Sequence, residues 1–172
     1  MEEQFKKAFS DAKCPYCGKD KLEIMQRIAQ IPLFGEVLEV VSVCKNCMYR
    51  YSSVLCLEQK EPVKIKFIVE KEEDMEVRIV KSQNCSVEIP ELGIEIKPGP
   101  ASEGFVSNVE GLFERIEEVL KALDEKNVMK LKEDIESVKK GKKKITLIFS
   151  DKSGVSAIVS DRAKKLKYSE KQ

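Results

Sequence analysis

The chain has 172 residues, of which 42% are hydrophobic and 35% charged, and its formal net charge is +1. This length suits one large domain or two small ones, and the charged start carries no apolar core of a signal segment. No stretch approaches the ~18 apolar residues of a membrane-spanning helix, so we expect a cytoplasmic protein with reduced thiols and no membrane contact.

Histidine is absent from the chain. Its absence excludes Ser-His-Asp and Cys-His catalysis, and it also excludes every zinc site that uses histidine. No pair of carboxylates stands out as an acid/base couple, and the scattered glycines form no phosphate-binding fingerprint. The sequence therefore predicts that the protein is not an enzyme and has no small-molecule substrate.

The first predicted elements surround two pairs of cysteines. Residues 3–12 have Phe5, Ala8 and Phe9 at helical spacing, which predicts a short amphipathic helix. Residues 22–28, 36–43 and 49–57 are predicted strands, since they are rich in β-branched and apolar residues. Residues 58–62 read as a linker.

The remainder of the chain alternates apolar and polar residues over short stretches, as strands do. We expect these later strands at 63–69, 75–81, 86–90, 92–97, 144–149 and 155–159. Two helices interrupt the series. The absence of βαβ alternation argues against a parallel sheet, so the pattern favours a mainly β protein with an inserted pair of helices.

The two predicted helices are 108–124 and 128–140. Ser107 is expected to cap the first helix, with Glu110 completing a capping box. Asn127 is the expected cap of the second helix and Gly141 its end. The short link between them predicts an antiparallel hairpin, and the narrow apolar stripe of the second helix favours packing against the first helix and little else.

The cysteine pattern carries the most chemical information. Cys14 and Cys17 form one C-x-x-C unit, and Cys44 and Cys47 form another after a gap of 26 residues. Two such units can present four thiolates to one metal ion in a closed tetrahedral site, which predicts a single structural zinc ion with no open position for substrate. Two redox dithiols are the alternative, and iron could occupy the same ligands.

Three other features leave alternatives open. Cys56 and Cys85 are single and are expected to be small buried side chains, although a disulfide or a reactive thiol is the competing interpretation. The segment Ile31, Pro32, Leu33 and Phe34 either packs into the core or forms an exposed docking patch for a partner. The basic end either solubilises the chain or makes a weak RNA contact, because residues 139–172 carry eleven basic and three acidic groups.

Several motifs together resemble one known family. They are Cys14-Pro-Tyr-Cys17, Ile31-Pro-Leu-Phe-Gly-Glu36, Cys44-Lys-Asn-Cys47, Val80-Lys-Ser82, Val87-Glu-Ile-Pro-Glu-Leu92, Val109-Glu-Gly-Leu112, and Asp151-Lys-Ser-Gly154 with Ser156. In this order they resemble the ZPR-type zinc-finger proteins, and more closely the short archaeal members with a single unit. The resemblance covers residues 14 to about 158.

The resemblance implies a fold and a partner. It implies a four-cysteine zinc ribbon over residues 1–60, then a double-stranded β-helix of jelly-roll type over residues 61–172 with an inserted helical hairpin at about 107–141. It also implies binding to translation elongation factor one-alpha and help with its folding. An RNA- or ribosome-associated zinc-ribbon protein is the alternative. The chain departs from the family at Met48, where glycine is frequent, and at 51–53 and the late turn.

Overall fold

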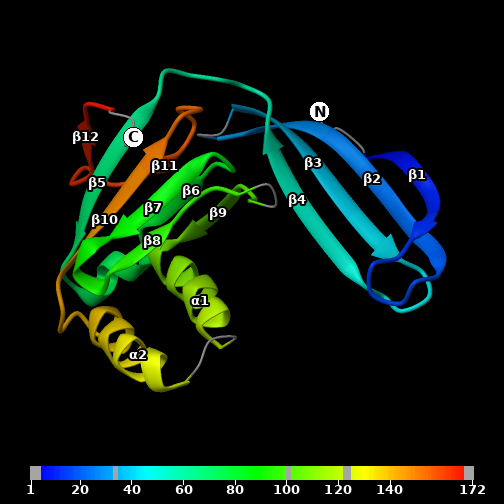
Figure 1. Cartoon of the computed structure of the whole chain (residues 1–172). Coiled ribbons are helices and arrows are strands. Elements are labelled where there is room, and N and C mark those ends of the chain that lie inside the picture. The colour runs from blue at the N-terminus through cyan, green and yellow to red at the C-terminus, as the bar shows by residue number, and fades with distance from the viewer. Residues whose placement is uncertain (1–4, 33–34, 100–101, 122–124, 169–172) are drawn as a thin grey trace.

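The computed structural model describes residues 5–32, 35–99, 102–121 and 125–168. These residues form three antiparallel sheets and two helices, so the expectation of a mainly β protein with a helical insertion is confirmed. Figure 1 shows one elongated sheet at one side of the molecule, two further sheets beside it, and the two helices together below these two sheets.

The elongated sheet comes from the first third of the chain. Its strands pair in the order β1-β2-β3-β4, with bounds Lys6–Lys13, Asp20–Ile31, Gly35–Cys44 and Arg50–Cys56. Strands β2 and β3 stay in register from Leu22 opposite Cys44 to Ile31 opposite Gly35. At ~3.3 Å per residue, the cysteine end of this hairpin lies about 30 Å from its turn.

The first strand corrects a prediction. Residues 6–13 form β1 and not a helix. Its pairing with β2 shifts register between Lys7 and Phe9 and again between Phe9 and Ala12, and Asp11 has a φ of 59°. Bulges of this kind change which face the next side chain occupies. The apolar residues therefore recur every three or four positions, and this spacing imitates a helix.

The remaining strands form a five-stranded and a three-stranded sheet. Their orders are β12-β5-β10-β7-β8 and β11-β6-β9. The larger sheet has strands Lys164–Leu166, Val63–Val69, Ile145–Asp151, Cys85–Ile89 and Ile94–Ile96. The smaller has Ala157–Ile158, Arg78–Lys81 and Phe105–Asn108. Strands on both sides of the helices share one sheet, since β10 pairs with both β5 and β7.

The main core lies between these two sheets and the helices. Alternate residues of the central strands point inward, as the period of two requires, and Phe67, Val87 and Phe149 are fully buried. Ile79 of the smaller sheet belongs to the same cluster. Truncating such a phenylalanine to alanine typically costs about 3–5 kcal/mol, so these side chains contribute strongly to the stability of the fold.

The helices α1 (Val109–Leu120) and α2 (Glu125–Lys139) lie against this core. The cap of α1 is Asn108 and not Ser107, because the Asn108 side chain accepts the Gly111 N–H at 2.8 Å. Helix α2 begins before Asn127, so that cap prediction is also wrong. Gly141 follows the end of α2, as predicted, and the Gly141 N–H donates to Val138 O.

No helix among the described residues is long and apolar enough to cross a membrane.

Helix α2 packs more widely than its narrow apolar stripe predicts. Val128, Ile135 and Val138 are buried members of the main core cluster, which also contains Met75. Met75 lies in a 3-10 helix, Glu72–Glu76, so the strand predicted at 75–81 begins only at Arg78, as β6. Asp74 caps this turn by accepting the N–H groups of Glu70 and Lys71, which diverts the backbone from strand pairing.

A buried carboxylate organises the loop after β10. Asp151 is fully buried and accepts hydrogen bonds from the Ser82 hydroxyl at 2.9 Å, the Ser153 hydroxyl and N–H, and the N–H groups of Val155 and Ser156. Burial alone raises a carboxyl pKa, but the hydrogen bonds from Ser153 and Ser156 hold the pKa of Asp151 below its ordinary value. Residues 69 positions apart are thereby tied together.

The same loop holds the connection between the elongated sheet and the rest. Ser153 O accepts the N–H of Lys60 at 2.8 Å. Gly154 has a φ of 70° and packs directly against the backbone of Glu61, since a Cβ added to Gly154 would lie 2.1 Å from Glu61 O. A small apolar cluster joins the two parts further. It consists of Val37, Val80 and Val155 with Ala29, Val54, Cys56 and Ala157 around them.

Candidate metal centre

Two loops with the same backbone pattern carry the four predicted metal ligands. The N–H of Cys14 donates to Lys19 O, and the N–H of Gly18 donates to Cys14 O, both at 2.9 Å. In the second loop the N–H of Cys44 donates to Tyr49 O at 2.8 Å, and the N–H of Met48 donates to Cys44 O at 3.0 Å. Each loop therefore turns tightly enough to present both of its sulfurs on one side.

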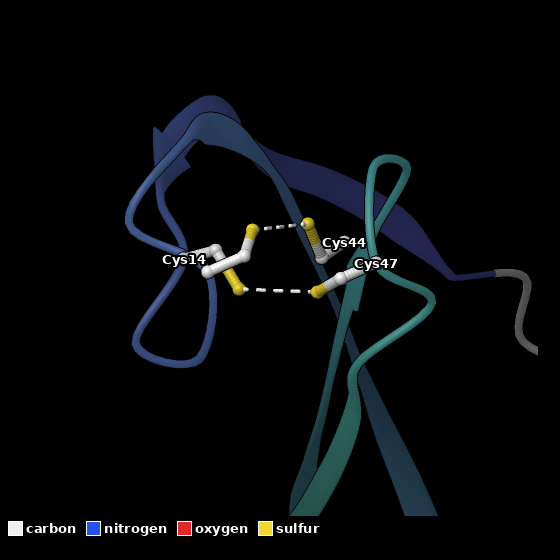
Figure 2. Close-up of side chains that lie close together, drawn as sticks. Cys14, Cys44 and Cys47 are labelled. Carbon is white, nitrogen blue, oxygen red and sulfur yellow. Dashed lines mark hydrogen bonds between the residues drawn. The ribbon is translucent and has the colours of Figure 1, made fainter.

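The four sulfurs converge. All four Sγ atoms lie within 4.8 Å of one another, and the Cys14–Cys47 and Cys17–Cys44 separations are both 3.7 Å. Figure 2 shows the sulfurs of Cys14, Cys44 and Cys47 facing each other across the two loops. A tetrahedron with metal–sulfur bonds of ~2.3 Å has edges of ~3.8 Å, so these separations fit one ion at the centre of the four sulfurs.

Backbone donors around the sulfurs favour the thiolate, the form that binds metal. The N–H of Lys19 lowers the pKa of Cys17, and the N–H groups of Cys47 and Asn46 lower the pKa of Cys44 to about 6. The pKa of Cys47 rises to about 12, because burial and the neighbouring sulfurs outweigh its bond from the Tyr49 N–H. A divalent cation would relieve this crowding of negative charge.

Side chains around the loops add positive charge and packing. The Asn46 amide lies 3.7 Å from the Cys17 sulfur and also accepts from Lys19 at 3.3 Å. Tyr16 stacks on Tyr49 with ring centroids 6.3 Å apart. Sequence reasoning did not single out Asn46 or this ring pair. Asn46 and Tyr16 occupy x positions of the C-x-x-C units and Tyr49 follows the second unit, where side chains are expected to contact the ligands and orient them.

Gly18 and Met48 occupy equivalent positions, each four residues after the first cysteine of its loop. Both have left-handed backbone, with φ of 71° and 60°. Glycine adopts this conformation without a steric penalty, whereas a residue with a side chain bears a cost of about 1 kcal/mol. The second loop therefore keeps the geometry of the first in spite of an unfavourable residue.

The other predicted site residues lie elsewhere. Leu33 and Phe34 fall outside the described residues. Ile31 pairs with Gly35 at the turn end of the hairpin, and Pro32 is exposed. This end faces away from the cysteine loops.

The two single cysteines lie apart from the metal centre, and their thiols are free. Cys85 is fully buried, and burial raises its pKa to about 12. Cys56 is half-buried, and burial raises its pKa to about 11. Both positions suit unreactive side chains.

Comparison with known proteins identifies the family. The family model of the ZPR1 jelly-roll domain matches residues 73–171. An uncharacterized ZPR1-like protein of Pyrococcus horikoshii is 43% identical over 171 residues, which cover 92% of this chain and 77% of that protein. A second ZPR1-like protein, from Methanocaldococcus jannaschii, is 43% identical over 157 residues, covering 86% and 79%.

A more distant relative has a name that states a role. The zinc finger chaperone zpr1 of Schizosaccharomyces pombe is 34% identical over 107 residues, which cover 61% of this chain and 23% of that protein. The two-sheet architecture and the family match together confirm the predicted jelly-roll domain. The chain is a member of the ZPR1 family of zinc-finger proteins.

Proposed function

We propose that Cys14, Cys17, Cys44 and Cys47 hold one structural zinc ion, in a ribbon domain of residues 1–60 that precedes a β domain of residues 61–172. The convergence of the four sulfurs within 4.8 Å carries this proposal. With four protein ligands the ion has no vacant position, so its role is to fix the two loops. A non-catalytic role agrees with the names of the relatives, which are zinc finger proteins and a chaperone.

The protein's function, in this proposal, is to bind translation elongation factor one-alpha and to assist its folding. The support is family membership together with the chaperone name of one relative. Ile31, Pro32, Leu33 and Phe34 remain the proposed contacts at the turn of the hairpin. Pro32 is exposed there, and exposed apolar residues at a turn suit contact with a partner protein.

The charges of the basic end weigh against RNA binding as the main role. Five of its cations contact carboxylates that precede it in the chain, at distances of up to 3.2 Å: Lys139–Glu117, Lys140–Glu136, Lys143–Asp134, Lys144–Glu70 and Arg162–Glu70. Cations that already face carboxylates release fewer counterions on binding phosphates. Five of the eleven basic groups of this segment are thus already paired within the molecule.

The direct test mixes the purified zinc-loaded chain with the purified elongation factor from the same source and measures binding by size-exclusion chromatography and calorimetry. Refolding of denatured elongation factor is followed by its recovery of nucleotide binding. We expect a complex and a higher refolding yield with the wild-type chain. A Pro32→Ser, Leu33→Ser, Phe34→Ser variant should weaken both by at least tenfold.

Two controls separate the causes of any loss. Cys44→Ser removes one metal ligand and should abolish both activities, whereas Cys56→Ser leaves the metal ligands intact and should retain them. Absence of a complex with the zinc-loaded wild-type chain, at micromolar concentrations of both proteins, would contradict the proposed partner.

A further inference from the structure

A hollow of about 680 Å³ lies between helix α1 and the edge strand β8. Figure 1 shows α1 lying below β8 and β9, far from the cysteine loops. The walls of the hollow are mostly apolar. They include Ile94 and Ile96 of β8 and Leu112 and Ile116 of α1. This size and lining are typical of a ligand site, and β8 ends its sheet, so its outer edge pairs with no strand of the described residues.

Two cations line the same hollow and share one aromatic ring. The Arg115 guanidinium carbon lies 4.4 Å from the Phe105 ring centre, and Lys81 Nζ lies 5.9 Å from it. Among the described residues neither cation has a carboxylate within ion-pair distance. The carboxylates at the rim are engaged elsewhere, Glu95 with Lys97 and Glu103 with the Tyr51 hydroxyl.

Lys81 is the unusual member of this pair. Only 4% of the residue is exposed, and its ammonium group donates to Ser82 O at 3.1 Å, although an ammonium group has three donors. The charge of Asp151 acts on this ammonium group, but the oxygens of Asp151 already accept hydrogen bonds from Ser82, Ser153 and backbone N–H groups. Burial lowers the pKa of Lys81, which means that the charged form lacks a full set of partners here.

We propose that this hollow binds an extended apolar segment of a partner protein, with one acidic side chain of that segment placed between Lys81 and Arg115. The apolar walls would take the neighbouring side chains, and the free edge of β8 offers main-chain donors and acceptors to an extended chain. A carboxylate supplies the missing acceptors through charge-assisted hydrogen bonds. The inference builds on the proposed protein-binding function and assigns it a second contact site.

The test uses two synthetic peptides and the full-length zinc-loaded chain. The probes are acetyl-Ser-Leu-Val-Glu-Val-Leu-Ser-amide and the same peptide with Gln for Glu, titrated into nitrogen-15-labelled protein and followed by amide chemical shifts. We expect shifts confined to β8, β9 and α1, with the Glu peptide binding at least fivefold more tightly than the Gln peptide. Arg115→Gln, a change at an exposed side chain, should reduce that preference to less than twofold.

A matched pair of glutamate substitutions tests the site without changing the core. Val119 lines the hollow and is 65% exposed, and Met129 on α2 is 62% exposed and lies outside it. Val119→Glu places a carboxylate one helical turn from Arg115 and should lower the affinity for the Glu peptide at least fivefold. Met129→Glu should leave the affinity for this peptide within twofold of the wild-type value.

Equal binding of the two peptides, equal effects of the two glutamate substitutions, or shifts outside the hollow would overturn the inference. Because the peptides are tested without the elongation factor, such a result would leave the proposed partner untouched. Failure of the elongation factor to bind would likewise leave the peptide result standing.

Discussion

Each cysteine loop contains one residue with a left-handed backbone conformation, Gly18 in the first loop and Met48 in the second. Gly18 has no heavy atom within 4 Å of an added Cβ, so a side chain there would be opposed only by its φ of 71°. Met48 already bears that cost at the equivalent position. The two positions therefore predict opposite effects for exchanging glycine and a larger residue.

We expect Gly18→Ala to weaken zinc binding and Met48→Gly to strengthen it, each by about 0.5–1 kcal/mol. This corresponds to a factor of about 2–5 in affinity, which competition with a zinc chelator can measure. Gly99→Ala is the matched control, because Gly99 also has open space around it but no positive φ. Effects of the same sign at positions 18 and 48 would contradict the explanation.

The buried Asp151 gives a second prediction at this scale. In Asp151→Asn an amide group would face N–H and hydroxyl donors, which leaves donors unpaired and should lower the free energy of unfolding by about 2–4 kcal/mol. Because the folded pKa is lowered, the contribution of the carboxylate is complete above roughly pH 4, the unfolded pKa, and is lost as the pH falls further.

The free energies of unfolding of wild type and Asp151→Asn, measured with urea, should therefore differ by a constant amount between pH 6 and pH 8. The difference should narrow below pH 4. Asp161→Asn, at an exposed position, should behave as wild type throughout. A difference under 0.5 kcal/mol at neutral pH would show that the carboxylate does not organise the loop.

At the scale of elements, the sequence pattern predicts most of the regular strands because their inward side chains alternate. Strands β2, β3, β5 and β10 were expected close to their observed bounds. The failures have local causes. The bulges of β1 imitate helical spacing, and β12 has no buried residue to mark it. The 3-10 turn capped by Asp74 delays the start of the strand predicted at 75–81 to Arg78.

The candidate site was predictable for a different reason. The C-x-x-C spacing predicts that two sulfurs leave one tight turn together, and the β2–β3 hairpin, with Leu22 opposite Cys44, brings the two turns side by side. The hollow with Lys81 and Arg115 was not predictable, because these residues are distant in sequence and only the packing of α1 beside β8 and β9 joins them.

Removing the metal should affect the elements unequally. The sheet of β1–β4 has its own small cluster around Cys14, Leu22 and Cys44, and the metal supplies much of the folding free energy of such small modules. We expect amide hydrogen exchange in β2 and β3 near the cysteine loops to quicken by at least a hundredfold after chelation under reducing conditions. The amides of β5 and β10, in the main core, should change less than threefold.

Cys44→Ser should reproduce the exchange pattern of the chelated protein, and Cys56→Ser should match the wild type. Uniform acceleration across both parts of the molecule would mean that the metal stabilises the whole chain as one unit.

In the whole molecule, the two parts are joined by a short linker, a small apolar contact, a bridge between Val54 and Gly104, and the hydrogen bond from the Tyr51 hydroxyl to Glu103. Val37 of β3 is fully buried against Val80 and Val155, and the Lys60 N–H is bound by Ser153 O. Val37→Ser places an unpaired hydroxyl in this contact, which typically costs about 1–3 kcal/mol. We expect the two parts to tumble more independently in nitrogen-15 relaxation measurements.

Val106→Ser is the control for that change, since Val106 is 43% exposed and belongs to a strand of the second part. It should leave the relaxation unchanged. Identical rotational correlation times for the two parts in Val37→Ser would show that the apolar contact around Val37 does not fix their orientation.

The four-sulfur zinc site is tested by X-ray absorption at the zinc edge on the purified full-length chain, combined with elemental analysis. We expect one zinc ion per chain, surrounded by four sulfur atoms at ~2.3 Å, and the same spectrum in Cys56→Ser. A chain purified without tightly bound metal, or a metal shell that contains oxygen or nitrogen, would contradict it.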